Sequence, residues 1–281
     1  MSISDLPSLY EVVKFYGLAA DKRLGQHFLL DMNITDKIAR LTTPLDNVTL
    51  VEIGPGPGGL TRSLFKAGAE NVIAIEMDNR FIPALTNISD KANGHLRIIE
   101  GDALKVDIAK ETNGEIKIAA NLPYNVGTKM LTNWLTAEPM FWSRAVLMFQ
   151  KEVAERVVAK VGDKAYGRLA ILSQSVCQTQ LAFTVPARAF SPPPKVDSAV
   201  VVLDVLDKPY SHLEALGKIT AAAFGQRRKM LRKSLKSFAQ NNGLEVETWC
   251  ASCDVISTHR PEELPVKDFQ ILTDYFVKHS I

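Results

Sequence analysis

Five short apolar runs alternate with helical patterns through the first half of the chain, and this alternation restricts the possible folds more than any other feature. The runs cover residues 49–53, 71–76, 96–100, 116–120 and 145–149. The helices between them are expected to begin near Gly59, Asn79, Gly127 and Lys151. Strands that are apolar along their whole length are buried on both faces, and parallel strands need crossover helices. The sequence therefore predicts an α/β fold, built on a parallel sheet covered on both sides.

Two further strands are expected at residues 182–185 and 198–206, with the turn-rich segment 191–194 (SPPP) between them. Because no helical pattern separates the two, we expect them to extend the sheet edge as an antiparallel hairpin. That gives seven strands, mostly parallel. Only helical patterns follow the Lys208-Pro209 pair, so the predicted domains are residues 1–207 and a small all-helical domain at 208–281.

The composition is that of an ordinary soluble protein, with 46% hydrophobic and 23% charged residues. No apolar run approaches the ~18 residues of a membrane span, and the first fifteen residues lack the apolar region of a signal peptide. Cys250 and Cys253 form a lone CxxC, and even with His259 they do not complete a structural zinc site. We therefore expect no metal, no membrane contact and a reducing, cytoplasmic location.

A glycine-rich loop, residues 54–59 (GPGPGG), follows the first apolar run and precedes a helix. Glu76 ends the next strand, where a ribose-binding acid is expected in a nucleotide site. Both a dinucleotide and S-adenosylmethionine fit this pattern, as does a tight turn with no ligand. Pro55 and Pro57 lack the N–H groups that a pyrophosphate needs, which favours S-adenosylmethionine. Asp102, after the third strand, is placed to accept a hydrogen bond from an adenine amine.

The fourth strand ends in Asn121-Leu122-Pro123-Tyr124, at the edge of the sheet where such folds bind ligands. An adenine N6 is a poor nucleophile because its lone pair is delocalised into the ring. Two acceptors, the Asn121 side-chain oxygen and the Leu122 carbonyl, could turn that nitrogen toward tetrahedral geometry. Pro123 restricts the direction of that carbonyl, and Tyr124 could stack on an extruded base.

With this tetrapeptide in this position, the chain resembles the rRNA adenine-N6 dimethyltransferases, and the resemblance runs over essentially its full length. Further segments that carry it are 22–29 (KRLGQHFL), 149–156 (FQKEVAER) and 185–198 (VPARAFSPPPKVDS). The resemblance implies a Rossmann-like class I methyltransferase fold and S-adenosyl-L-methionine as the cofactor. It also implies the cofactor-binding residues, which are His27, Leu29, Gly54, Glu76, Asp102 and Asn121.

The resemblance places Phe190 beside the target base, opposite Tyr124; the alternative is a plain core aromatic. His27 stands where the family often has Asn, so its contact to the cofactor could come from the backbone or from the neutral ring.

Two later segments, 222–235 (AAFGQRRKMLRKSL) and 260–269 (RPEELPVKDF), resemble the housekeeping branch of this family. That branch implies a substrate: a pair of adjacent adenosines in the 3′-terminal hairpin loop of small-subunit rRNA, within the assembling 30S subunit. We expect the enzyme to be monomeric. A large-subunit rRNA methylase, a non-catalytic RNA-binding assembly factor and a NAD-dependent oxidoreductase are the alternatives.

Residues 215–244 contain seven basic residues and no acidic one. On one continuous helix, Arg228, Arg232 and Lys236 would share a face opposite an apolar side. A solvated face normally mixes both signs, so the stretch favours a phosphate-binding surface. The candidate RNA-binding residues are Arg227, Arg228, Lys229, Arg232, Lys233 and Lys236.

Overall fold

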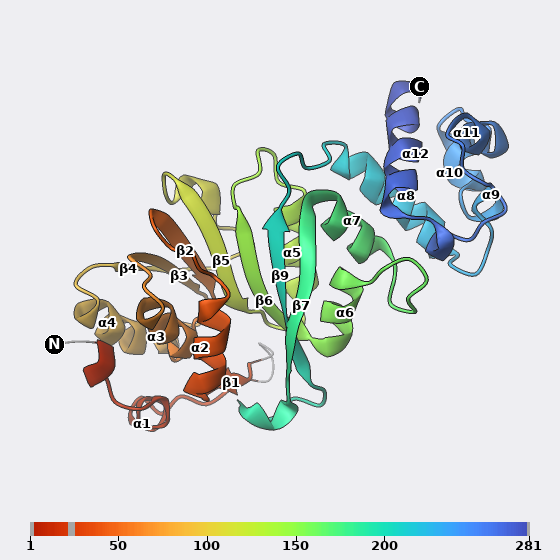
Figure 1. Ribbon diagram of the computed structural model, residues 1–281. Coiled ribbons are helices and arrows are strands. Elements are labelled where there is room, and N and C mark those ends of the chain that lie inside the picture. The colour runs from red at the N-terminus through yellow and green to blue at the C-terminus, as the bar shows by residue number, and fades with distance from the viewer. Residues whose placement is uncertain (1–2, 22–25, 280–281) are drawn as a thin grey trace. The chain divides into compact units, whose positions relative to one another are not determined.

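The computed structural model describes residues 3–21 and 26–279 (Figure 1). The chain forms two compact units. The first lies within Met1–Leu131, Ala137–Ala154 and Gln180–Asp204, and the second within Thr132–Thr136, Glu155–Thr179 and Val205–Ile281. The division of the chain into domains at 1–207 and 208–281 remains a prediction.

A seven-stranded sheet has the strand order β4-β3-β2-β5-β6-β9-β7. Its strands are β2 (Val48–Ile53), β3 (Asn71–Glu76), β4 (Leu96–Glu100), β5 (Glu115–Asn121), β6 (Arg144–Gln150), β7 (Cys177–Val185) and β9 (Ser198–Val205). The first five pair in parallel, and β9 runs antiparallel to β6. The predicted seven-stranded sheet with an antiparallel edge is confirmed, although β7 begins five residues before the predicted start at residue 182.

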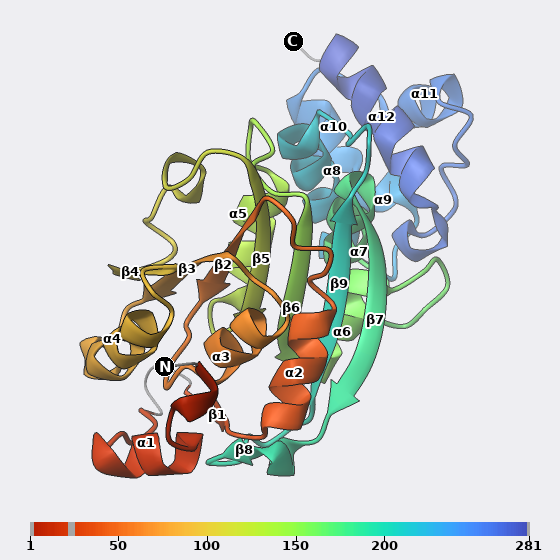
Figure 2. The same cartoon turned by 60° about the vertical axis from the view of Figure 1, so that its left-hand side comes forward.

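Helices α2 (Met32–Arg40), α3 (Gly59–Lys66) and α4 (Ile82–Lys91) stand in front of the sheet in Figure 2. The first unit also contains α1 (Leu9–Phe15) and the start of α5 (Gly127–Leu135), and α6 (Lys151–Val158) begins in it. Buried residues of α2, α3 and α4, such as Ile38, Leu64 and Leu85, join strand residues in one apolar core. Because each helix buries one face in this core, its apolar residues recur at helical spacing in the sequence.

The glycine-rich loop serves two purposes. Gly54 and Gly56 adopt left-handed φ values of 64° and 54°, and a Cβ on either would meet no atom within 4 Å. Gly58, at φ 87°, caps α3, and a Cβ there would overlap the Ile88 Cδ1 of α4. A Cβ on Gly59 would lie 2.9 Å from Leu9 Cδ1 of α1. The first two glycines therefore leave open space, whereas the last two let α4 and α1 pack closely.

A two-stranded antiparallel sheet, which the sequence did not indicate, joins β1 (Phe28–Leu29) to β8 (Phe190–Ser191). Leu29 lies opposite Phe190 in its register. Phe28, Leu29 and Phe190 are all buried in the core of the first unit. This short pairing fixes residues near the N-terminus against the loop that precedes β9.

The second unit contains α7 (Arg168–Val176), α8 (Leu213–Gly225), α9 (Leu231–Ser234), α10 (Lys236–Asn241), α11 (Val246–Ser252) and α12 (Val266–His279). Helix α7 was not expected. The rings of Phe238, Trp249 and Phe276 pack together, and the Trp249 indole donates a hydrogen bond to the Leu272 carbonyl at 3.0 Å. None of the helices in the described part of the chain is long and apolar enough to cross a membrane.

The prediction of one continuous helix through the basic stretch was wrong. Residues 226–228 form a turn, residues 229 and 230 belong to no helix, and Leu235 separates α9 from α10. The cause is long-range hydrogen bonding, because the backbone N–H groups of Leu231 and Arg232 donate to the carbonyls of His259 and Ser257. Those donors are then not available to continue a helical ladder from residue 228.

Cys250 lies on α11 and Cys253 at its end, and both are buried. Burial raises the pKa of Cys250 to about 12 and that of Cys253 to about 11. The described residues contain no cluster of His, Cys, Asp and Glu suited to a metal ion.

Replacing Gly58 by Ala should destabilise the first unit through both left-handed strain and a clash with buried Ile88. We expect the free energy of unfolding to fall by about 2–4 kcal/mol. Gly68 also has a left-handed φ, 101°, but open space at its Cβ position. Gly68→Ala is therefore the matched control, with an expected loss of about 1 kcal/mol. Urea unfolding curves measure both, and equal losses would contradict the close packing of α4 on the loop.

Candidate functional site

The residues singled out by the sequence meet in one pocket of about 80 Å³, in the first unit. It lies where β2, β3 and β5 end, the edge at which parallel sheets bind ligands. Its lining residues are Gln26, His27, Phe28, Gly54, Gly56, Glu76, Phe81, Asn121, Leu122, Pro123 and Tyr124. A larger cavity of about 1270 Å³ lies between the N-terminal segment and α3, but it contains none of these residues.

Glu76 links the end of β3 to the glycine-rich loop. One carboxylate oxygen accepts the Gly56 N–H at 3.0 Å, and the other accepts the Asp78 N–H at 2.8 Å. Burial raises the pKa of this carboxyl group, against the opposing effect of these two hydrogen bonds. Because a carboxylate has about four acceptor positions, Glu76 retains the capacity to accept hydroxyl groups from a bound sugar.

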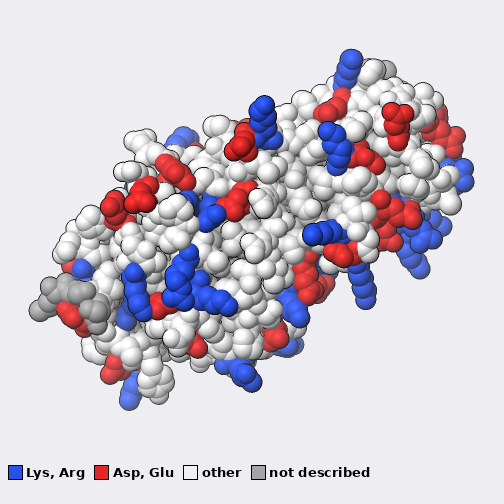
Figure 3. Space-filling model, viewed as in Figure 1, with Lys and Arg blue, Asp and Glu red and all other residues white. Residues whose placement is uncertain are grey.

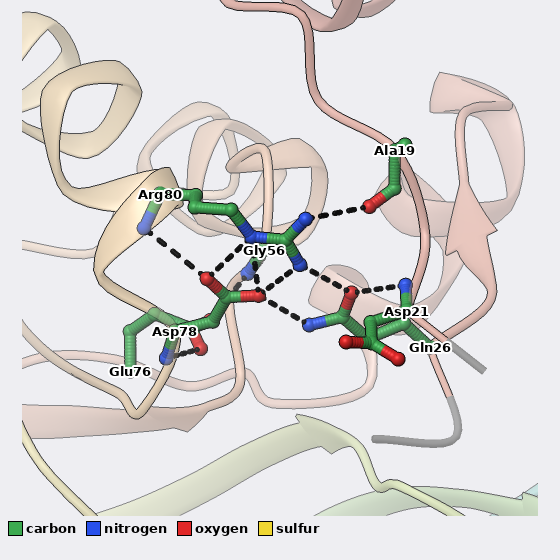
Figure 4. A network of polar contacts seen from close by, with 7 residues as sticks. All are labelled: Ala19, Asp21, Gln26, Gly56, Glu76, Asp78 and Arg80. Atoms are coloured by element: carbon green, nitrogen blue, oxygen red, sulfur yellow. Dashed lines mark hydrogen bonds and ion pairs between the residues drawn. The ribbon is translucent and has the colours of Figure 1, made fainter. Parts of the chain in front are cut away.

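A second polar network ties the N-terminal segment to the end of β3 (Figure 4). The Asp78 carboxylate accepts a hydrogen bond from the Gln26 amide at 2.8 Å and pairs with Arg80 at 2.5 Å. The Arg80 contact is the main cause that lowers the pKa of Asp78 to about 2. Arg80 also donates to the carbonyl of Ala19, and the Gln26 side-chain oxygen accepts the Asp21 N–H.

Asn121 ends β5, and its amide nitrogen lies 3.5 Å from the carbonyl of His27, to which it donates a long hydrogen bond. The amide NH2 of Asn121 is therefore used in a contact within the protein. The acceptor oxygen is then left for a ligand in the pocket. The next residue, Leu122, is buried, and its N–H donates to the Met148 carbonyl of β6 at 3.2 Å.

Tyr124 is half-buried, and its hydroxyl lies 2.7 Å from that of Ser198 on β9. Burial raises the pKa of this phenol, so it is protonated at neutral pH. The His27 ring lies against the Tyr124 ring, with 5.6 Å between centroids and a tilt of 30°. The His27 Nδ1 is 2.8 Å from the Pro192 carbonyl, which can only accept. His27 therefore contacts Tyr124, Asn121 and the loop before β9.

Several of the sequence-predicted site residues lie together in this pocket: His27, Gly54, Glu76, Asn121, Leu122, Pro123 and Tyr124. Leu29 and Phe190 do not line it, because they face each other in the small β1–β8 sheet and are buried in the core. Asp102 does not line it either, and its carboxylate accepts the Leu104 N–H at 3.0 Å. The roles of these three remain predictions. Residues 22–25 of the N-terminal motif lie outside the described residues.

Sequence reasoning missed Gln26 and Asp78. Their closeness in sequence to predicted site residues could have indicated them. Gln26 precedes His27 within the N-terminal motif, and Asp78 follows Glu76 by two positions. What the sequence did not indicate is that the two side chains, 52 positions apart, meet each other.

The basic stretch acquires acidic neighbours in the folded second unit. Arg227 pairs with Glu262 at 2.5 Å, and Arg232 lies 3.8 Å from Glu247. Figure 3 likewise shows basic and acidic side chains side by side over this unit. The other candidate side chains of the stretch are exposed: Arg228, Lys229, Lys233 and Lys236. A pocket of about 630 Å³ is lined by Arg232, Lys233 and Lys236 together with Glu245 and Glu247.

Comparisons with known proteins agree on one family. The sequence model described as ribosomal RNA adenine dimethylase matches residues 17–271. A protein named ribosomal RNA small subunit methyltransferase A from Maricaulis maris is 51% identical over 97% of this chain and 96% of its own length. The protein of that name from Agrobacterium fabrum is 50% identical over 97% of this chain and 99% of its own.

Solved structures also match. A dimethyladenosine transferase from Plasmodium falciparum has a TM-score of 0.75 and 28% identity over 90% of this chain and 98% of its own. The 23S rRNA methyltransferase ErmE has a TM-score of 0.66 and 22% identity over 89% and 99% of the two chains, and this similarity concerns the fold alone.

Arg80→Met should lower the free energy of unfolding only modestly at neutral pH, because Arg80 is 43% exposed and an exposed ion pair contributes little. Asp78 has a depressed pKa, so its contribution is present above about pH 4 and is lost as the pH falls toward 2. The difference between parent and variant should therefore shrink over that range. Unfolding curves at several pH values measure it.

Arg97→Met is the control for this test, since it removes a more exposed ion pair with Glu111. The effect of Arg97→Met should be smaller at neutral pH. A parent–variant difference for Arg80→Met that is constant from pH 7 to pH 2 would refute the assigned role of Asp78.

Proposed function

The chain belongs to the ribosomal RNA adenine dimethylase family, and from that membership we propose that it transfers methyl groups to the N6 amine of adenosines in small-subunit rRNA. The observation that carries the proposal is the position of Asn121-Leu122-Pro123-Tyr124, at the end of β5 and in one pocket with Glu76. An oxidoreductase would have no use for this tetrapeptide. Near-complete coverage of relatives named for the small subunit favours that substrate over the large subunit.

The polar groups and open glycine positions at this pocket suit S-adenosyl-L-methionine, which supplies the methyl group as part of a sulfonium. Gly54 and Gly56 leave open space where any side chain would project, and Glu76 can accept the ribose hydroxyls. Pro55 and Pro57 lack N–H groups, a loss that matters for a pyrophosphate and not for a sulfonium ligand. By family resemblance, His27, Leu29, Asp102 and Asn121 complete the contacts.

Asn121 and Leu122 activate the nucleophile in this proposal. The Asn121 side-chain oxygen and the Leu122 carbonyl each accept one N–H of the adenine amine, which turns the nitrogen lone pair out of conjugation with the ring. Pro123 limits the conformations of Leu122 and so directs its carbonyl. Tyr124 stacks on the target base, a contact worth about 1–3 kcal/mol in single-strand binders. By family resemblance, Phe190 contacts the opposite side of the base.

The full substrate is a pair of adjacent adenosines in the 3′-terminal hairpin loop, each dimethylated, in an assembling small subunit in the cytoplasm. The enzyme acts as a monomer. The basic residues Arg227, Arg228, Lys229, Arg232, Lys233 and Lys236 contact phosphates of this RNA. Their exposed members support that role, whereas the partners of Arg227 and Arg232 reduce the net charge of the surface.

The decisive test incubates the protein with radiolabelled S-adenosylmethionine and small subunits from a strain that lacks this modification. Label should appear as dimethyladenosine at the two adjacent positions, and large subunits should stay unlabelled. Label on large-subunit rRNA alone would identify the other branch of the family. If neither the small nor the large subunit is labelled, the proposed activity is refuted.

Asn121→Ala in the same assay should reduce the single-turnover rate by roughly tenfold to a hundredfold. A hydrogen bond to a group that develops charge is worth about 1.5–3 kcal/mol, and about 1.4 kcal/mol corresponds to one decade in rate. Asn121→Asp keeps an acceptor and should retain more activity than Asn121→Ala. An Asn121→Ala rate within threefold of the parent would refute the two-acceptor mechanism.

Lys233→Ala combined with Lys236→Ala should weaken RNA binding and flatten its dependence on salt. The log–log slope should fall by roughly 0.7–0.9 for each phosphate that the variant no longer neutralises. The affinity for the methyl donor should not change. Lys218→Ala is the control, because Lys218 belongs to the same basic stretch but pairs with Glu214 on α8. A salt slope equal to that of the parent would identify this surface as merely solvated.

A further inference from the structure

The Tyr124 hydroxyl is anchored to a single buried side chain. Its partner, Ser198, is fully buried, and the two oxygens are 2.7 Å apart. Ser198 precedes the apolar run 199–203, all of it buried, so it is the polar exception in the buried part of β9. A hydrogen-bond partner offsets the cost of burying a hydroxyl, and Tyr124 is that partner for Ser198.

Ser198 is itself held firmly by the backbone around it. It lies opposite Gln150 at the end of the β6–β9 pairing. The preceding residue, Asp197, accepts the Lys151 N–H on its carbonyl and the Ala187 N–H on its side chain, both at 2.9 Å. The sheet and the loop before β9 therefore fix the position of Ser198.

The hydroxyl of Tyr124 has no evident chemical role, because methyl transfer to adenine needs acceptors at N6 and not a phenol. Its protonated state suits a hydrogen-bonding anchor. With the hydroxyl fixed, rotation about the two side-chain torsions is restricted, and the ring plane is set before any base arrives. The His27 ring, 5.6 Å away, supports the same orientation from one side.

We infer that Ser198 is a positioning residue for methyl transfer. Its hydroxyl bonds to the Tyr124 hydroxyl and so holds the Tyr124 ring in the orientation that stacks on the target adenine. This inference rests on the proposed function. Pre-orientation of a stacking platform places the adenine N6 at the Asn121 oxygen and reduces the conformational entropy lost in reaching a reactive geometry. Nothing in this role contacts the methyl donor or the RNA backbone.

The test compares Ser198→Ala, Tyr124→Phe and the double variant on unmethylated small subunits. Each single change deletes one side of the same hydrogen bond and should lower kcat by roughly two- to tenfold. The double variant should be no slower than the slower single variant, because the bond can be lost only once. KM for the subunit and the affinity for S-adenosylmethionine should stay at the parent values, since the ring and the phosphate contacts remain.

The control is Ser173→Ala on α7. Ser173 is also fully buried, but its hydroxyl has no hydrogen-bond partner among the described residues. This variant should methylate at the parent rate. If Ser198→Ala does not fold, which its thermal unfolding curve would reveal, Tyr124→Phe alone decides the matter.

Losses that multiply in the double variant would overturn the inference, as would parent-like kcat in Tyr124→Phe. An effect confined to KM, with kcat at the parent value, would also overturn it. These outcomes are distinct from failure of the proposed function, in which the parent protein itself labels no small-subunit rRNA.

Discussion

The carboxylate of Glu76 is the contact on which the rest of the site depends. It accepts one N–H from the glycine-rich loop and another from Asp78, so it fixes the end of β3 to the end of β2. Asp78 in turn holds Gln26 and Arg80, which places the N-terminal segment over the same strand ends. Polar groups at buried sites are stable only when they satisfy one another, and here that requirement assembles three distant segments into one pocket.

The reaction that we propose for this pocket relies on acceptors and orientation, not on an acid–base pair. Asn121 directs its amide nitrogen to the His27 carbonyl, which leaves its oxygen available to a ligand. Tyr124 is held at its hydroxyl by Ser198. His27 accepts the Asn121 amide on its carbonyl, packs its ring against that of Tyr124, and bonds through its Nδ1 to the Pro192 carbonyl. His27 thus connects the N-terminal segment to the loop before β9.

The second unit shows where a linear reading of charge fails. Residues 215–244 contain no acid, yet Glu247 and Glu262 approach Arg232 and Arg227 in the fold. The expected single helix is interrupted because residues 231 and 232 donate their backbone N–H groups to residues 259 and 257. Both effects come from residues that follow the basic stretch in sequence, so neither was visible from the stretch itself.

The sequence by itself determined the alternation of strands and helices in the first half of the chain, the glycine-rich loop and the tetrapeptide at residues 121–124. These are local features, since apolar periodicity and turn residues act over a few positions. Only the tertiary structure decided that Gly58 and Gly59 serve helix packing, that Phe190 and Leu29 pair in a small sheet, and that Gln26 meets Asp78. Each of these depends on atoms brought together from positions far apart in the chain, and no local pattern encodes such a distance.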